Sequence, residues 1–366
     1  MSVLDNDNRL KLGIFGTNVS YGCSATTAEG TWEATWPANV EMVTLADQAG
    51  LEAFIPVARW RGFGGKTNFN GTCFETYTWA AGLGAITKHI VVFSTSHVPT
   101  IHPIVAAKQA TTIDHISNGR FGLNIVCGWY EAEFRMFGAS VMEHNTLYEY
   151  AAEWFEVMRK LWTVEDEFDY EGRYFTVEKG FHQPKPIQKP YPPIMNAGSS
   201  PTGARFAAKY ADMVFTSVGD LNDETTSKVK GLRDMGREFE REFQLWTSCS
   251  IVCRPTEKEA LDYARYYILE NGDWEAVANL SGARPDRPWQ HPGPDPNNLK
   301  NPGWGGYMLL GTPEQIAEKL IKLSKFGVDG TVLSWVNYPD GMRQFSKEIL
   351  PLLEQAGLRR PFKGVG

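Results

Sequence analysis

The sequence predicts an α/β protein of the (β/α)8 class, a TIM barrel with insertions. Short apolar segments alternate with helical patterns along all 366 residues, as expected for parallel strands joined by crossover helices. Eight strand and helix pairs can be counted in order, and eight such units close into a barrel. An open, doubly wound sheet is the alternative, because it is built from the same alternation.

The expected elements follow one another regularly. Strands are expected at residues 11–16, 51–58, 89–96, 119–129, 192–200, 212–217, 244–255 and 329–336. The helices after them are expected at residues 38–50, 74–87, 103–116, 147–162, 201–210, 222–243, from 256 onward, and 341–357. One more helix precedes the last strand. It begins with the capping pattern of Thr312 and Gln315 and ends at Gly327.

Two insertions interrupt a single barrel domain that covers residues 1–366. The first, near 165–190, predicts a hairpin that turns at Glu171 and Gly172, followed by proline-rich extended chain. The second, near 280–307, is too rich in proline and glycine for regular structure. Long loops of this kind are often active-site lids. Three large side chains favour that interpretation: Trp289, His291 and Trp304.

Composition narrows the class of partner. The net charge is −7 and no basic stripe occurs, which argues against nucleic acid. No signal peptide is visible, and no apolar run approaches the roughly 18 residues needed to cross a bilayer. We therefore expect a soluble, cytoplasmic protein without a membrane partner. The five cysteines show neither a CxxC pair nor zinc-type spacing, so we expect them to be reduced and expect no metal site.

The strand ends carry the candidate chemistry, because the active site of such a barrel lies at the carboxyl ends of its strands. The third strand ends in Thr95 and His97, and the fourth contains Asn124, a polar residue in an apolar strand, and leads to Trp129. Arg59, Trp60 and Arg61 follow the second strand and begin a glycine-rich loop, RWRGFGGKTNFNG. That loop matches neither the P-loop nor the GxGxxG pattern, and GxSxG and HExxH are also absent.

The fifth strand leads into a helix through small residues, Gly198, Ser199 and Ser200. Free backbone N–H groups at such a helix N-terminus can bind phosphate. An ordinary serine cap has the same sequence, so both interpretations stay open.

Three stretches together resemble the bacterial-luciferase-like flavin-dependent monooxygenases. They are TIDHISNGRFGLNIVCGWYEAEF, PPIMNAGSSPTGARFAAKYAD and LLGTPEQIAEKLIKLSKFGVDG. Within that family, RGFGGKT and NIVCGW are most similar to the pyrimidine monooxygenases, while EGRYFTVEKGFHQPKPIQKPYPPI is also similar to the dimethylsulfone monooxygenases. The resemblance implies a barrel that binds FMN at the strand ends, receives it reduced from a separate NAD(P)H:flavin reductase, and uses dioxygen as co-substrate. It also suggests a homodimer or homotetramer.

The resemblance also implies roles for individual residues. Ala58 and Arg59 would lie beside the flavin, and Glu133 would contact it. Thr95 and Asn124 would lie near the face where dioxygen reacts, and His97 is a third candidate catalytic residue. Phosphate-side contacts would come from Tyr148 and Ser200, with Gly198 and Ser199, and substrate contacts from Trp60, Arg61 and Trp129. Leu147 departs from the family, because an arginine is expected there; Lys66, Arg205 or backbone amides would have to compensate.

The sequence is compatible with several functions. The favoured one is an FMNH2-dependent two-component monooxygenase acting on a cyclic amide or pyrimidine-like compound. The alternatives are a monooxygenase that cleaves C–S bonds of sulfones or sulfonates, a deazaflavin-dependent oxidoreductase on the same barrel, and a non-catalytic flavin-binding protein.

Overall fold

A closed barrel of eight parallel strands forms the centre of the molecule. The computed structural model describes residues 3–139, 142–283 and 293–364. Its barrel strands are, in ring order, β1 (Lys11–Phe15), β2 (Ala53–Ile55), β3 (Val91–His97), β4 (Phe121–Val126), β7 (Ile194–Asn196), β8 (Met213–Phe215), β9 (Gln244–Cys253) and β11 (Gly330–Ser334). The ring closes because β11 pairs with β1 and β9 pairs with both β8 and β11. The predicted barrel is therefore confirmed.

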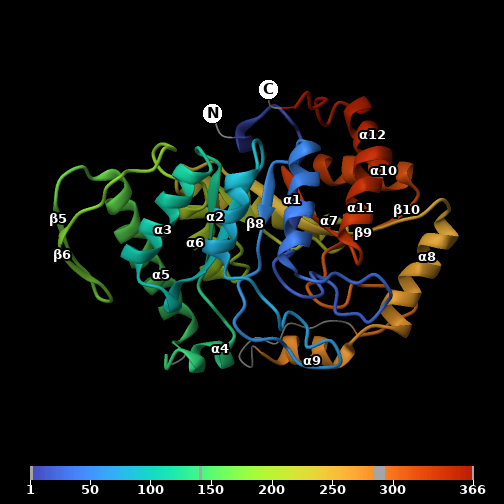
Figure 1. Ribbon diagram of the computed structural model, residues 1–366, viewed down its shortest axis with the longest axis horizontal. Coiled ribbons are helices and arrows are strands. Elements are labelled where there is room, and N and C mark those ends of the chain that lie inside the picture. The colour runs from blue at the N-terminus through green and yellow to red at the C-terminus, as the bar shows by residue number, and fades with distance from the viewer. Residues whose placement is uncertain (1–2, 140–141, 284–292, 365–366) are drawn as a thin grey trace.

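Helices surround this barrel (Figure 1). They are α1 (Trp36–Gln48), α2 (Thr76–Ile86), α3 (Pro103–Ile116), α5 (His144–Thr163), α6 (Pro201–Tyr210), α7 (Asp223–Glu238), α8 (Glu257–Arg265), α10 (Pro313–Lys325), α11 (Tyr338–Gln344) and α12 (Leu350–Gln355). In Figure 1 both termini lie at the top, whereas α4 (Glu131–Met136) and α9 (Trp274–Gly282) lie at the bottom. Because α4 follows the carboxyl end of β4, this lower side is the mouth of the barrel.

The interior of the barrel is apolar at its base and polar at its mouth. Phe93, Met195, Trp246 and Val332 belong to one buried cluster inside the ring. Side chains alternate between the two faces of a strand, so Thr95 follows Phe93 on the inner face of β3. The same strand therefore supplies a packed floor and, two residues later, a polar side chain for the cavity above it.

Two local predictions, a hairpin and a capping box, are confirmed. The hairpin is formed by β5 (Phe168–Glu171) and β6 (Thr176–Gly180), which pair antiparallel. Helix α10 has the predicted capping box, with Thr312 and Gln315 each accepting a hydrogen bond from the backbone of the other. The five cysteines are free; four are buried and Cys73 is half-buried. In the described ranges no helix is both long enough and apolar enough to cross a lipid bilayer.

Three α-helices or strands were not predicted. One is α4, which follows β4. Strand β10 (Tyr307–Gly311) pairs with the second half of β9 outside the ring, and α9 follows α8 and precedes the long loop. His144, expected in a loop, is the first residue of α5. Of the three large residues expected in a lid, Trp304 is part of the fold, whereas Trp289 and His291 lie outside the described residues.

Candidate active site

A cavity of about 250 Å³, here called the main cavity, lies at the carboxyl ends of the barrel strands. It brings together most of the residues that the sequence predicted. Those that line it are Ala58, Arg59, Thr95, His97, Asn124, Trp129, Tyr148, Gly198, Ser199 and Ser200. Phe15 and Phe215, whose ring centroids lie 6.3 Å apart, add apolar lining from two further strands. Residues more than 150 positions apart in the sequence thus share one site.

Thr95 and Asn124 are held side by side on the paired strands β3 and β4. The Thr95 hydroxyl donates to the Pro56 carbonyl oxygen at 2.7 Å, and the Asn124 amide nitrogen lies 3.2 Å from the Thr95 hydroxyl oxygen. The amide oxygen of Asn124 is buried and has no hydrogen-bond partner within residues 3–139, 142–283 and 293–364. Buried polar atoms nearly always have a partner, so this oxygen marks a position for a hydrogen-bond donor from a ligand.

Arg59, His97 and Glu133 form a second polar group, in which all three side chains are buried. Nη2 of Arg59 lies 3.5 Å from Oε2 of Glu133 and 3.3 Å from Nε2 of His97. Because a guanidinium only donates, Nε2 of His97 must accept, and the ring proton therefore sits on Nδ1. That nitrogen lies 3.6 Å from Oε2 of Glu133. The contacts define a neutral tautomer of His97 clamped between a cation and an anion.

Burial dominates the titration of this group. Burial and the charge of Arg59 lower the pKa of His97 to about 3, so the imidazole is neutral near pH 7. Burial also lowers the pKa of Arg59, which Glu133 opposes. Burial raises the pKa of Glu133, while Arg59 and two backbone N–H groups oppose the shift. The carboxylate accepts from the backbone N–H of Trp60 at 2.6 Å and of Arg61 at 3.2 Å.

The glycine-rich loop folds around Arg59. Four aromatic rings lie with their centroids 4.9 to 5.9 Å from the guanidinium carbon: Phe63, Trp129, Tyr130 and Trp304. Gly64 and Gly65 have φ angles of +67° and +69°, which residues other than glycine rarely adopt. Their turn lets Phe63 reach the aromatic group from the loop. These rings and the barrel wall shield Arg59 from water.

A phosphate-type cradle lies where β7 leads into α6. Ser200 is the N-cap of α6 and accepts from the Gly203 N–H at 2.9 Å. Gly198 packs so closely that a Cβ atom would lie 2.6 Å from the Gly203 carbonyl oxygen. Nε2 of His144 lies 2.9 Å from the Ser200 hydroxyl oxygen, and the His144 ring packs edge-on against Tyr148. A helix N-terminus beside an imidazole suits an anionic group.

His144 was not among the predicted site residues. Leu147, where the resemblance led us to expect an arginine, packs in the core. Arg205 does not compensate for it, because its guanidinium pairs with Glu238 at 2.8 Å on the surface. Lys66 is exposed and does not line the main cavity. His144 lies one helical turn before Leu147. Among the residues that line the main cavity, it is the basic side chain that contacts the cradle.

Three predicted site residues lie outside the main cavity. Glu133 sits behind Arg59 and does not line it, so its contact is with Arg59 rather than with the cavity. Arg61 is exposed and lines neither this cavity nor the next. Trp60 lines a second cavity of about 200 Å³, here called the side pocket. The side pocket shares Ala58, Arg59, Thr95 and His97 with the main cavity. Its other lining includes Tyr77, Ser96, Gln109 and Phe137.

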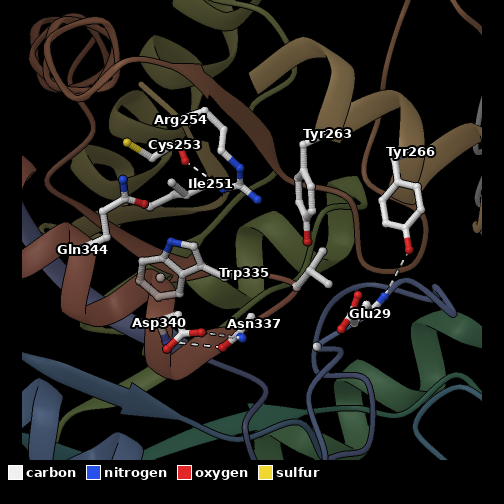
Figure 2. Close-up of a pocket in the computed structure, with 13 residues that line it drawn as sticks. Glu29, Ile251, Cys253, Arg254, Tyr263, Tyr266, Trp335, Asn337, Asp340 and Gln344 are labelled. Carbon is white, nitrogen blue, oxygen red and sulfur yellow. Dashed lines mark hydrogen bonds between the residues drawn. The ribbon is translucent and has the colours of Figure 1, made fainter. Parts of the chain in front are cut away.

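An outer groove of about 460 Å³ runs between α8 and α11, away from the barrel axis. Figure 2 shows Tyr263, Tyr266 and Trp335 around it, with the Arg254 guanidinium beside the Tyr263 ring. The guanidinium carbon lies 3.9 Å from that ring centroid, and Arg254 also donates to the Cys253 carbonyl oxygen. No buried side-chain atom of this groove lacks a partner among the described residues. The described residues that line the groove therefore have no buried polar atom without a hydrogen-bond partner, in contrast to those of the two cavities at the barrel mouth.

The comparison with protein families decides the class. Residues 14–330 match the model described as luciferase-like monooxygenase, which is most of the chain. The chain belongs to the luciferase-like monooxygenase family. It is therefore an enzyme of the monooxygenase class, as the resemblance implied.

Individual proteins are similar to this luciferase-like monooxygenase over nearly its whole length. It is 30% identical to the pyrimidine monooxygenase RutA of Acinetobacter baylyi over 361 residues, which covers 94% of this chain and 95% of the relative. It is 27% identical to the FMNH2-dependent dimethylsulfone monooxygenase of Pseudomonas putida over 356 residues, covering 94% and 96%. The crystal structure of the long-chain alkane monooxygenase LadA superimposes with a TM-score of 0.85 at 20% identity, covering 98% and 94% of the two chains. At that identity the structural likeness supports the fold alone.

Proposed function

We propose that this luciferase-like monooxygenase is the oxygenase component of a two-component system, which uses FMNH2 and dioxygen to oxidise a small cyclic amide or pyrimidine-like compound. The observation that carries the proposal is the main cavity. It joins an unpartnered amide oxygen of Asn124 to a phosphate-type cradle at Ser200. The similarity to pyrimidine monooxygenases over nearly the whole chain supports the substrate class.

The residues fit flavin mononucleotide. Ser200, Gly198 and Ser199 would hold the phosphate, with His144 and Tyr148 beside it. Ala58, Arg59, Thr95 and Asn124 would lie along the ring system, whose edges carry both donors and acceptors. Reduced FMN, when bound, supplies the two electrons that activate dioxygen.

The chain's own residues would orient the reactants, donate and accept hydrogen bonds, and keep water out of the main cavity. Thr95 and Asn124 would orient dioxygen and hold the proton that it acquires near the Asn124 amide oxygen. Arg59 keeps one buried N–H group, on Nη1, for a carbonyl-type oxygen of the substrate. His97 stays neutral and acts as a positioning residue for Arg59. Trp129 and Trp304 would exclude water from the cavity.

A reductase must deliver the reduced flavin, by transient contact or by diffusion, and we propose a homodimer or homotetramer. A second candidate activity is oxidation of a sulfone, which the 27% identity to the dimethylsulfone monooxygenase favours. The two activities differ in substrate but share the cofactor and the oxygen chemistry.

Reconstitution tests the proposal directly. The protein, FMN, a flavin reductase and NADH are incubated under isotopically labelled dioxygen with uracil or with dimethyl sulfone. Mass spectrometry should find one labelled oxygen atom in the uracil product. Incorporation into dimethyl sulfone alone would select the second candidate. Absence of labelled product across panels of both compound classes, or tight binding of a deazaflavin in place of FMN, would overturn the proposal.

A further inference from the structure

The side pocket lies on the helix side of the barrel wall. Ser94 and Ser96 share the outer face of β3, because side chains alternate along a strand, and the Ser94 hydroxyl donates to the Thr76 carbonyl oxygen of α2. Gln109 approaches from α3. The side pocket is thus bounded by α2, α3 and the tips of β2 and β3, and it meets the main cavity at Arg59 and His97.

Unsatisfied polar atoms gather in this small volume. Eight buried side-chain nitrogen or oxygen atoms lack a partner among the described residues, and four of them belong to residues that line the side pocket. These four atoms are Arg59 Nη1, Tyr77 Oη, Ser96 Oγ and Gln109 Oε1, of which the hydroxyl groups of Tyr77 and Ser96 interact with each other. Ser96 and Tyr77 are only 2% and 4% exposed. Native interiors rarely leave buried polar groups unpaired, so the Arg59 nitrogen and the Gln109 oxygen point to a ligand, to which the two hydroxyl groups can also bond.

The chemistry of these atoms defines a complementary molecule. Arg59 offers an N–H donor, the Gln109 carbonyl oxygen is an acceptor, and the two hydroxyls of Tyr77 and Ser96 can play either part. A planar molecule with both a C=O and an N–H group, as in a lactam or a pyrimidinedione, satisfies this set. Trp60 and Phe137, which pack edge-on with their centroids 5.1 Å apart and are 45% and 44% exposed, form an aromatic rim.

The local charges exclude an anion. The charge of Arg59 is balanced by Glu133 at 3.5 Å, and His97 is neutral. Glu75, which also lines the side pocket, keeps its carboxylate as the N-cap of α2 by accepting from the N–H groups of Tyr77 and Thr78 at 2.9 and 2.7 Å. The wall therefore carries no excess positive charge, and an acidic ligand would meet a carboxylate.

We propose that the side pocket is a binding site for a small, neutral, planar amide, with its carbonyl oxygen on Arg59 and its N–H on Gln109. Binding at this site needs no flavin. An amide held there lies beside the residues that also face the main cavity, so it is placed next to the oxygenation site. That last step, which makes the amide the substrate, rests on the proposed function.

Calorimetric titration with uracil as the probe tests the site, using both FMN-free and FMN-loaded protein. Wild-type protein should bind uracil in both forms. Gln109→Leu and Ser96→Ala should each weaken binding by about tenfold, because each removes one buried hydrogen bond. Gln355→Leu, an equivalent change at the exposed end of α12, should leave uracil affinity unchanged. FMN affinity, measured separately, should be the same in all four proteins.

Each other result overturns the inference. No uracil binding by the wild type, unchanged binding by both variants, or displacement of uracil by FMN would place no amide in the side pocket. Methanesulfonate binding as tightly as uracil would refute the neutral class. Circular dichroism confirms that the variants fold, and crystals soaked in uracil locate the probe if one variant is unstable. Failure of FMN to bind would refute the proposed function instead, and the titration of FMN-free protein would still decide the amide site.

Discussion

Replacing Glu133 by glutamine should destabilise the protein strongly, although the change removes only a charge. The carboxylate lies 3.5 Å from Nη2 of Arg59, and both side chains are 2% exposed. With an effective dielectric constant of about 20, two unit charges at this distance attract by about 5 kcal/mol. Breaking a buried ion pair by removing one partner typically costs about 3–5 kcal/mol, because the remaining charge is left buried and uncompensated. We therefore expect Glu133→Gln to lower the free energy of unfolding by about 3 kcal/mol or more.

Urea unfolding followed by circular dichroism measures this loss, and the neighbouring pair in α4 supplies a matched control. Glu131 pairs with Arg135 four residues later, with side chains 39% and 75% exposed, so Glu131→Gln should cost no more than about 0.5 kcal/mol. The double variant Arg59→Met with Glu133→Gln should recover most of the loss, because it removes both charges. Equal costs at Glu133 and Glu131, or a double variant that merely sums the two single losses, would refute the reasoning.

The remaining predictions concern binding, acid stability and turnover. His144→Ala should weaken FMN binding by about tenfold and leave riboflavin binding unchanged; fluorescence titration measures both affinities, and equal losses for the two ligands would contradict this. His97 has a folded pKa near 3, below its unfolded value, so its contribution to stability is present at neutral pH and is lost as the pH falls below about 6.5. Unfolding at pH 7 and pH 5 should show a loss of about 2 kcal/mol from this residue, which His97→Gln abolishes; an unchanged acid dependence would count against a neutral, buried imidazole. Asn124→Ala should lower product formation by about 100-fold with an unchanged urea midpoint, and a fully active variant would show that the oxygen site lies elsewhere.

Local signals predicted some elements to the residue. Helices α3 and α6 have the predicted bounds, because each begins with a proline in its first turn after a residue whose side chain caps the helix. Strand β2 is shorter than predicted. The expected strand covered residues 51–58, but only Ala53–Ile55 pairs with its neighbours. Pro56 has no N–H to donate, so the ladder ends there while the chain remains extended.

Strand β10 was missed because its existence depends on the length of another strand. The first seven residues of β9 pair with its two ring neighbours, β8 and β11, and the last five, Cys249–Cys253, pair with β10. The sequence indicated an additional pairing partner for β9, because the predicted strand at 244–255 was longer than the other barrel strands. A strand that outruns its neighbours leaves unpaired backbone groups, which a further strand can satisfy.

The site was predicted as a set of strand ends, but its internal pairing was not. Arg59 follows β2, His97 is the last residue of β3 and Glu133 lies in α4 after β4, so only the register of these three strands brings their atoms within 4 Å. From sequence alone, Glu133 could be assigned to the flavin through family resemblance. Its partners within the protein, Arg59 and the backbone of the glycine-rich loop, are seen only in the structure.

This pairing bears on the charge of the substrate. Among the described residues that line the main cavity, Arg59 is the only lysine or arginine, and no aspartate or glutamate lines it. Because Glu133 compensates the charge of Arg59, the cavity near Asn124 and Thr95 offers no unpaired cation to an anion, whereas the Ser200 end has the N-terminus of α6 and the His144 imidazole. A flavin phosphate at the His144 end and a neutral substrate at the Arg59 end match this distribution. A sulfonate would bring a second negative charge to the end where the only cation is already paired, so uracil or dimethyl sulfone should be oxidised in preference to methanesulfonate.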